Sequence, residues 1–205
     1  MSRVYIFKRF ERFWHWSQAA LIILMLLSGF EVHGSYTAFG WQKAASLHTL
    51  AAWALITLWA FAIFWHFTTG EWKQYIPTTE KILAVMHYYA FGIFDPKAHH
   101  PFRTTQLTKH NPLQRLAYLF VKLFISPLIW ISGLLYLYYH DLSAYGIGNL
   151  GGLQLGTIAL AHTLAAFLML IFLIVHVYFA TTGHTPLAHI KAMITGWEDL
   201  EQETR

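Results

Sequence analysis

Four windows of this chain are each long and apolar enough to cross a lipid bilayer, at about residues 13–32, 44–67, 113–139 and 155–180. A helix needs roughly 20 residues to span the hydrocarbon core, and helices and closed barrels are the structures that satisfy their own backbone there. Hydrophobic residues make up 56% of the 205 residues and charged residues only 12%, unlike a soluble domain. The sequence therefore predicts an all-α integral membrane four-helix bundle, forming a single domain over residues 1–205.

The distribution of basic residues predicts the orientation of these spans. Almost all lysines and arginines fall in the termini and in the loop between the second and third windows, while Lys43 falls clearly on the other side. Basic segments stay in the cytoplasm, so we expect both termini there, in a multi-pass protein of the bacterial inner membrane. The net charge of +4 then reflects topology. Because no soluble domain carries a basic face, we expect no nucleic-acid partner.

The predicted inner loop, residues 68–112, is long and mixed in composition. Within it, residues 81–94 are apolar but too short to span a bilayer. This segment predicts an interfacial helix, with packing on the bundle or on a partner, or a loop lying on lipid, as the alternatives.

The chain has no cysteine and 13 histidines. The lack of thiols excludes disulfides, cysteine-bound iron–sulfur clusters and zinc sites, and the covalent attachment of c-type haem. A redox metal in this protein must therefore depend on imidazole ligands. The cofactor that imidazole pairs hold in helical bundles is haem b.

Two short repeats lie inside the apolar windows. LHTLAA (47–52) recurs as AHTLAA (161–166), so His48 and His162 both begin long apolar stretches, and LLSGF (26–30) resembles WISGL (130–134). Histidines inside a membrane are costly and are usually functional. The glycines of the second repeat, Gly29 and Gly133, would allow a flat macrocycle or a neighbouring backbone to approach closely.

Two further histidines complete a pattern of depth. His176 lies 14 residues after His162, on the same helix face and about 21 Å away. His15 lies 13 residues before Ser28, where the third window has Leu119. With the amino terminus inside, His48 and His162 lie near the outer face and His15 and His176 near the inner face. Bis-imidazole ligation needs two rings at one depth, which predicts these two pairs.

Other roles for these histidines stay open. His15 could belong to an interfacial aromatic belt, His48 and His162 could join helices by hydrogen bonds, and a non-haem metal site is possible. Arg12, with Arg9, could meet haem propionates or could only determine topology.

His66 lies 18 residues after His48, on the same face and at the inner end. It could replace His15 as a ligand, or snorkel to the boundary. We favour a role as proton acceptor beside a quinone, with Gln18, Glu71 and His184 as neighbours.

Several stretches resemble a known family: RFWHWSQAALIILMLLSGF (12–30), LHTLAAWALI (47–56), FWHFTTGEWKQYIP (64–77), NPLQRLAYLFVKL (111–123) and the segment from His162 to Trp197. Together they are similar to the prokaryotic di-haem cytochromes b, the membrane subunits of nickel–iron hydrogenases, formate dehydrogenases and thiosulfate reductases, and most closely to the thiosulfate-reductase type. The resemblance places His15, His48, His162 and His176 at the family's haem-ligand positions.

The resemblance implies a membrane cytochrome that binds two haem b groups and passes electrons between the quinone pool, menaquinone or ubiquinone, and a redox partner subunit. That partner would be periplasmic, of the molybdenum and iron–sulfur or the multihaem type, and the protein would work within a respiratory chain surrounded by lipid. Two alternatives remain. One is a stand-alone quinone-reducing cytochrome b that oxidises a small reductant such as superoxide, and the other is a non-redox membrane anchor.

Overall fold

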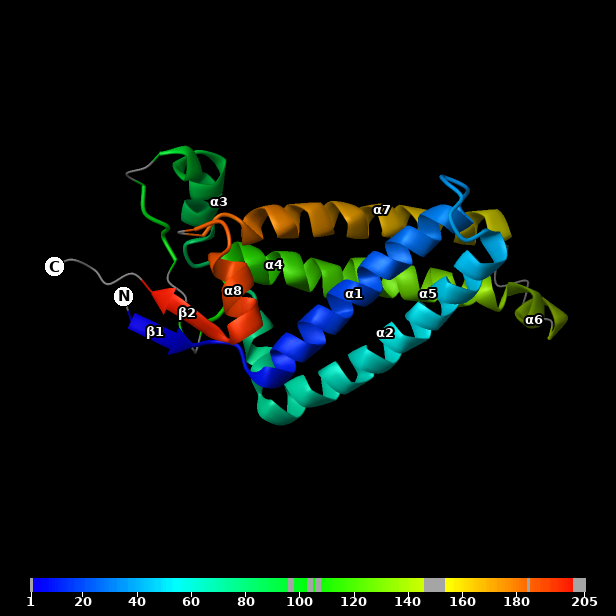
Figure 1. Cartoon of the computed structure of the whole chain (residues 1–205), viewed down its shortest axis with the longest axis horizontal. Helices are drawn as coiled ribbons and strands as arrows, with labels where there is room; N and C mark the ends of the chain where they lie inside the picture. Colours follow the sequence, from blue (N-terminus) through cyan, green and yellow to red (C-terminus); the bar gives the residue numbers. More distant parts are fainter. Residues whose placement is uncertain are drawn as a thin grey trace. The chain divides into compact units, whose positions relative to one another are not determined.

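The computed structural model describes residues 2–95, 98–102, 105, 108–145, 154–183 and 185–200, and four of its helices are long and apolar enough to cross a membrane (Figure 1). They are α1 (Arg9–Val32), α2 (Trp41–Thr69), a composite helix over Pro112–Leu137, and α7 (Leu155–Ala180). The all-α membrane fold and its four spans are thus confirmed. Their ends differ by a few residues from the apolar windows, because polar residues begin or end several of the helices.

The chain divides into two compact units. Unit 1 comprises Met1–Ile76, Arg103–His110 and Ala180–Arg205, and therefore holds α1 and α2. Unit 2 comprises Pro77–Phe102 and Asn111–Phe179, and holds the composite helix and nearly all of α7. Each unit thus contributes two of the four spans.

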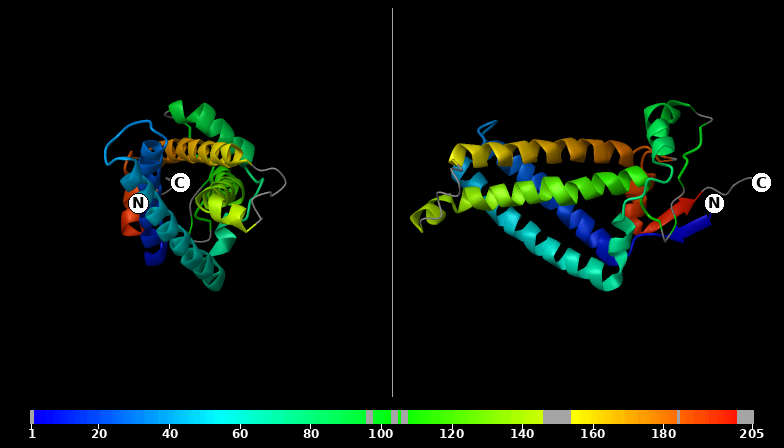
Figure 2. Two further views of the ribbon diagram at one scale, coloured as in Figure 1. Left: turned by 90° about the vertical axis from the view of Figure 1, so that its right-hand side faces the viewer. Right: turned by 180° about the vertical axis from the view of Figure 1, so that it is seen from behind.

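In unit 1, α1 and α2 lie side by side and run in opposite directions (Figures 1 and 2). One carboxylate holds the loop between them: Glu31 Oε1 accepts hydrogen bonds from the backbone N–H groups of Ala38, Phe39 and Gly40, at 2.8, 2.7 and 2.7 Å. Helix α2 ends at Gly70, whose φ of 76° is the left-handed conformation that glycine adopts without strain. The short 3₁₀ helix η1 (Glu71–Tyr75) follows.

Where α1 begins, unit 1 brings the two ends of the chain together. Strand β1 (Ser2–Tyr5) pairs in antiparallel fashion with β2 (Trp197–Leu200), with Tyr5 opposite Trp197. Helix α8 (Ala188–Thr195) leads into β2, and its last turn contacts α1. Trp16 Nε1 donates to Met193 O at 3.1 Å, which ties α1 to the last turn of α8. No pattern in the sequence predicted this small sheet.

Unit 2 contains α3 (Ile82–Ala90), the 3₁₀ helix η2 (Gly92–Phe94), α4 (Pro112–Phe120), the π-helical turn η3 (Val121–Ile125), α5 (Ser126–Leu137), α6 (Tyr139–Ala144) and α7. Helix α4 begins directly after Asn111, its N-cap residue. Asn111 Oδ1 accepts from Gln114 N at 2.8 Å, and Gln114 Oε1 accepts from Asn111 N at 2.9 Å, which is a capping box. Helix α7 runs beside α4 and α5 (Figure 2).

Helix α3 is the predicted helix of the inner loop. It is attached to the spans of unit 2 through Tyr89, whose ring lies 4.5 Å from that of Phe179 and whose hydroxyl accepts from Asn111 Nδ2 at 3.2 Å. Leu83, 77% exposed, and Phe91, 68% exposed, point away from the unit. The helix itself is confirmed, while its place at the membrane surface stays a prediction.

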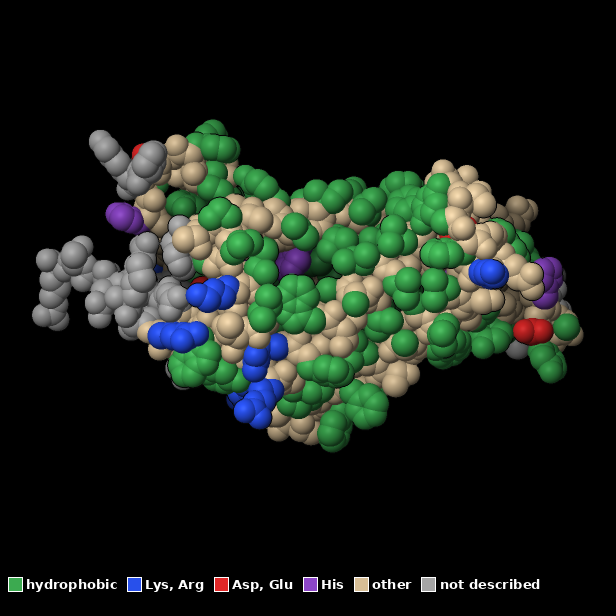
Figure 3. Space-filling view, viewed as in Figure 1, with side chains coloured by type: hydrophobic (Ala, Val, Ile, Leu, Met, Phe, Trp, Pro, Cys, Tyr) green, Lys and Arg blue, Asp and Glu red, His purple; other side chains and the backbone are tan. Residues whose placement is uncertain are grey.

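On the face shown in Figure 3, hydrophobic side chains are exposed all along the long helices, and lysines and arginines gather over α8, β1 and the beginning of α1. In water such a surface would be unstable, because exposed apolar area is unfavourable. Lipid removes that cost, as expected for spans that face a bilayer.

Candidate functional site

His48 in α2 is held against α1 through one of its ring nitrogens. Its Nδ1 lies 3.1 Å from Met25 O and 3.1 Å from Ser28 Oγ. A backbone carbonyl can only accept, so Nδ1 carries the proton. Ser28 already donates its own proton to Leu24 O at 2.7 Å, so its oxygen also accepts from Nδ1. The neutral ring then presents Nε2 as its metal-binding nitrogen.

His162 in unit 2 repeats this arrangement. Its Nδ1 lies 3.1 Å from Ile129 O and 3.2 Å from Ser132 Oγ in α5. Ser132 in turn donates to Leu128 O. The two predicted repeats therefore meet in each unit, with the serine of one orienting the histidine of the other and fixing the same tautomer.

The two repeat glycines pack directly against these rings. A Cβ on Gly29 would lie 3.2 Å from Cε1 of His48, and a Cβ on Gly133 would lie 3.0 Å from Cε1 of His162. Both distances are shorter than ordinary van der Waals contact, so a side chain at either position would clash with the imidazole ring. An oriented, neutral imidazole on an apolar helix is the donor that haem b requires, and both sites fit that cofactor.

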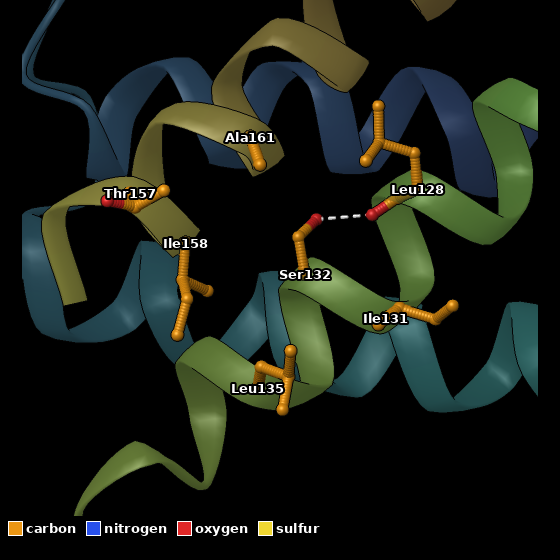
Figure 4. A pocket seen from close by; sticks show the side chains of 7 residues that line it. All are labelled: Leu128, Ile131, Ser132, Leu135, Thr157, Ile158 and Ala161. Carbon is orange, nitrogen blue, oxygen red and sulfur yellow. Dashed lines mark hydrogen bonds between the residues drawn. The ribbon is translucent and has the colours of Figure 1, made fainter. Parts of the chain in front are cut away.

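A cavity of about 180 Å³ lies beside the His162 site, between α5 and α7 (Figure 4). Ser132 borders it, and so do Ile158 and Ala161, which precede His162 on α7. The remaining lining residues are Leu128, Ile131, Leu135 and Thr157. This mostly apolar space suits a hydrophobic group near the ligand.

The second pair of predicted ligands lies towards the other ends of the helices. In α1, the ring of His15 lies 5.2 Å from that of Trp16, edge to face. In α7, His176 stacks on Phe172 at 5.6 Å and meets Tyr118 of α4 at 6.3 Å. Both histidines are half-buried among aromatic rings. The pairings His48 with His162 and His15 with His176 join residues of different units and stay predictions.

His66 is buried, with 7% of its surface exposed, near the end of α2. Its Nδ1 donates to Ala62 O at 2.6 Å, so Nε2 is the basic nitrogen. Residue 62 corresponds to residue 176, because each lies 14 positions after the repeated histidine (48 + 14 and 162 + 14). His66 therefore lies one helical turn beyond the position that bears His176 in unit 2.

Two of the three predicted neighbours of His66 have partners of their own. Gln18 Oε1 accepts from Trp59 Nε1 at 2.7 Å. Glu71 belongs to an ion cluster in which the buried Lys109 Nζ lies 2.7 Å from Glu11 and 2.9 Å from Glu71, and Lys8 Nζ lies 2.6 Å from Glu71. Burial alone would raise the pKa of Glu71, but its bonds to Lys8 and Lys109 together lower it below 4.5. At neutral pH this carboxylate is ionised and paired.

Arg12 Nη1 donates to Ile194 O in α8 at 2.6 Å, so this guanidinium joins α1 to the last turn of α8. Predicted as a possible propionate partner, it is also a structural link. His184 lies outside the described residues.

Sequence reasoning identified the histidines but not Ser28 and Ser132 as the residues that orient them, nor the ion cluster of Lys109. The serines were visible in the repeat LLSGF and WISGL, whose glycines alone received a role. Lys109 carried no signal, because its partners Glu11 and Glu71 lie 98 and 38 residues away in the chain.

Comparison with known proteins supports a cytochrome. The family described as "Prokaryotic cytochrome b561" matches residues 6–196. The "Putative cytochrome YdhU" of Escherichia coli (strain K12) is 29% identical over 201 residues, covering 96% of this chain and 75% of the relative. No solved structure matches the chain.

Proposed function

Since this chain belongs to the prokaryotic cytochrome b561 family, a family of membrane electron-transfer proteins that bind haem b, we propose that it passes electrons between the quinone pool and a redox partner subunit through two b haems. In this proposal it works in the respiratory chain of a bacterial inner membrane. The basic residues around the beginning of α1 support a cytoplasmic place for that end.

The observation that carries the proposal is the duplicated histidine site. In both units a backbone carbonyl and a serine hydroxyl receive the Nδ1 proton, so His48 and His162 each offer Nε2 to the iron of the outer haem. The same bonds join α2 to α1 and α7 to α5, so haem content is what separates a ligand from a histidine that only joins helices. His15 and His176 are the proposed ligands of the inner haem.

Haem iron, when bound, supplies one-electron chemistry between its ferric and ferrous forms. The chain's residues fix the position and the protonation state of the ligands. Gly29 and Gly133 keep space around the outer pair, and Arg12, through guanidinium protons that Ile194 does not use, is available to a propionate.

His66 is the proposed proton acceptor of a quinone site near His15. It is buried, its basic nitrogen is Nε2, and Trp14, which lies 5.1 Å from its ring, is the neighbour of His15 in sequence. Oxidation of one quinol breaks two O–H bonds and releases two protons and two electrons. Gln18 helps to shape the site, whereas Glu71 stabilises it through its ion pairs rather than by accepting protons.

The partner is proposed to be a periplasmic redox subunit that exchanges electrons with the outer haem. The relative's printed name, a putative cytochrome, is consistent with electron transfer. If the purified protein instead reduced quinone with superoxide and needed no partner, the stand-alone alternative would replace this proposal.

The experiment is to add a short-chain quinol to the purified, oxidised protein and follow the b-type absorption band. We expect both haems to become reduced, and an added acceptor of the partner class to reoxidise them. A protein that binds haem but exchanges no electrons with either menaquinol or ubiquinol would contradict the quinone role. A folded protein without haem would contradict both redox functions and favour the role of a non-redox membrane anchor.

A further inference from the structure

Three aromatic rings from three elements surround the buried His66. Its ring centroid lies 5.1 Å from Trp14 in α1, 5.1 Å from its neighbour Trp65 in α2 and 5.5 Å from Tyr75 in η1. The two tryptophans meet the imidazole edge to face, at 79° and 87°. This aromatic box holds the imidazole ring from several sides.

The indole of Trp14 has an unused donor. Among the described residues its Nε1–H is buried and has no hydrogen-bond partner. An indole nitrogen can only donate, and a buried donor without an acceptor is unfavourable, so buried tryptophans usually have a partner. An acceptor supplied by a bound molecule would remove this penalty.

The ring beside Trp14 offers the complementary group. His66 Nδ1 donates to Ala62 O, so Nε2 accepts. A donor and an acceptor on adjoining rings can both bind one oxygen atom that accepts one hydrogen bond and donates another. The hydroxyl oxygen of a quinol has this property, and the quinone oxygen left after its oxidation still accepts from the indole.

We propose that Trp14 is a quinone-binding residue, that its Nε1–H and His66 Nε2 hold the same oxygen of the head group, and that Tyr75 and His110 lead the released proton to the aqueous surface. This inference rests on the proposed function. It adds the binding donor and the proton route, neither of which follows from the presence of His66.

The route follows contacts between rings. Tyr75 lies between the two histidines, with its ring 5.5 Å from His66 and 5.4 Å from His110. His66 is buried, while Tyr75 and His110 are half-buried. A phenol hydroxyl both donates and accepts, and imidazole exchanges protons near neutral pH, so the residue types suit a relay.

The ion cluster holds this relay in place. Lys109 N donates to Gln74 Oε1 at 3.1 Å, which fastens the residue before His110 to the residue before Tyr75. The side chains of Glu11, Glu71, Lys8 and Lys109 bind one another, and Arg12 binds α8. The proposed route uses the three rings and none of these five charged groups.

The proton and electron balance is simple. The O–H bond held by Trp14 and His66 yields one proton, which passes to His66 Nε2, and one electron, which leaves towards His15. The second O–H bond lies at the opposite end of the head group and releases its proton and electron there, so one proton per quinol passes through the relay.

Trp14→Phe tests the binding donor, since phenylalanine keeps an aromatic ring without the N–H. We measure the quinol dependence of haem reduction in the complete protein, with Trp72→Phe in η1 as the control. The expected result is that Trp14→Phe raises the KM for quinol ~10-fold. Its haem content and its reduction by dithionite stay at the wild-type level, and the control keeps the wild-type KM.

An unchanged KM in Trp14→Phe would overturn the binding role. Loss of haem from that variant would assign the indole to the haem site and would also overturn it. If the wild type itself fails to respond to quinol, the proposed function fails, which is a different outcome from an intact wild type with an insensitive variant.

His110→Gln tests the relay. We expect the maximal rate of quinol-driven haem reduction to fall several-fold at unchanged KM, and added imidazole to restore much of it. A pH-sensitive dye should show proton release slowed in parallel. An unchanged rate, or a loss that imidazole does not restore, would contradict a proton-carrying role for His110.

Discussion

The two units share a histidine site but differ beyond it. In unit 1, His48 of α2 rests on the carbonyl of Met25 and on Ser28, and in unit 2, His162 of α7 rests on Ile129 and Ser132 with nearly equal distances. The repeats LLSGF and WISGL, and LHTLAA and AHTLAA, thus encode one local geometry twice. In both copies a backbone carbonyl and a serine hydroxyl orient the imidazole ring.

The units differ about four to five helical turns away from this shared site. Unit 1 has a histidine on its first helix, His15, where unit 2 has Leu119, and unit 2 has His176 on its second helix where unit 1 has Ala62. Each unit therefore carries one further candidate ligand, but on opposite members of its helix pair. Unit 1 alone adds His66, and with it the aromatic box and the adjoining ion cluster.

The largest expected effect concerns the shared site. Replacing either His48 or His162 by alanine should remove the same haem, because the two are the proposed ligands of one iron, and should halve the haem per chain. Absorption and electron paramagnetic resonance spectra of the two variants should coincide. Exposed histidines of each unit, His33 and His140, supply the control substitutions.

If His48→Ala and His162→Ala instead removed different haems, the proposed pairing across the units would be wrong. The equivalence of the two sites would survive, but each ligand would belong to another iron.

The second effect belongs to unit 1 alone. Lys109→Met leaves the carboxylates of Glu11 and Glu71 without their shared, buried cation, and loss of one partner from a buried ion pair costs about 3 kcal/mol. The unfolding temperature of the variant in detergent should be lower than that of the wild type. Lys43→Met, at an exposed position in α2, is the matched control and should unfold like the wild type.

A pH dependence follows from the same cluster and should be weaker. Lys8 and Lys109 lower the pKa of Glu71, so the stabilisation is fully present above its ordinary value of 4.5 and is lost as the pH falls through the lowered value. Unfolding temperatures measured from pH 7 to pH 3 should therefore drop most steeply below 4.5. Glu71→Gln should flatten that drop, and an equally steep curve would refute the assignment.

The glycines sharpen the comparison between the units. Alanine at Gly133 would place Cβ 3.0 Å from His162 Cε1, and alanine at Gly29 would place it 3.2 Å from His48 Cε1. Both should shift the haem midpoint potential or weaken binding, by about 1 kcal/mol, with the larger effect in unit 2. Redox titration distinguishes them, and a larger effect at Gly29 would mean that α1 yields less readily than α5.

The smallest effect is expected at the serines. Ser28→Ala and Ser132→Ala remove one acceptor from Nδ1 but leave the backbone carbonyl, so haem affinity should fall by about 1 kcal/mol or less. The two variants should behave alike in haem-loss kinetics. A large effect in one unit alone would break the equivalence of the sites.

The sequence predicted the features that depend on local pattern. The four spans follow from runs of apolar residues. The pairing of β1 with β2 was missed, because two four-residue strands at opposite ends of the chain carry too little pattern.

Some residues of the candidate site were also predictable from the sequence, and others were not. His48 and His162 were predictable because each recurs inside a repeat, and His66 because an ionisable group in an apolar helix is conspicuous. The roles of Trp14, Tyr75 and His110 were not predictable, since they depend on contacts that α1, α2, η1 and a distant loop make only after folding. A tryptophan among nine gives no sign that its N–H is unused.

The most direct measurement of the central claim is the haem content of the purified protein, from the pyridine haemochrome and a reduced-minus-oxidised spectrum. The account predicts a b-type spectrum with two haems per chain, and one haem per chain after His48→Ala or His15→Ala. A wild-type protein with a single haem, or a His48→Ala variant that keeps both, would contradict it.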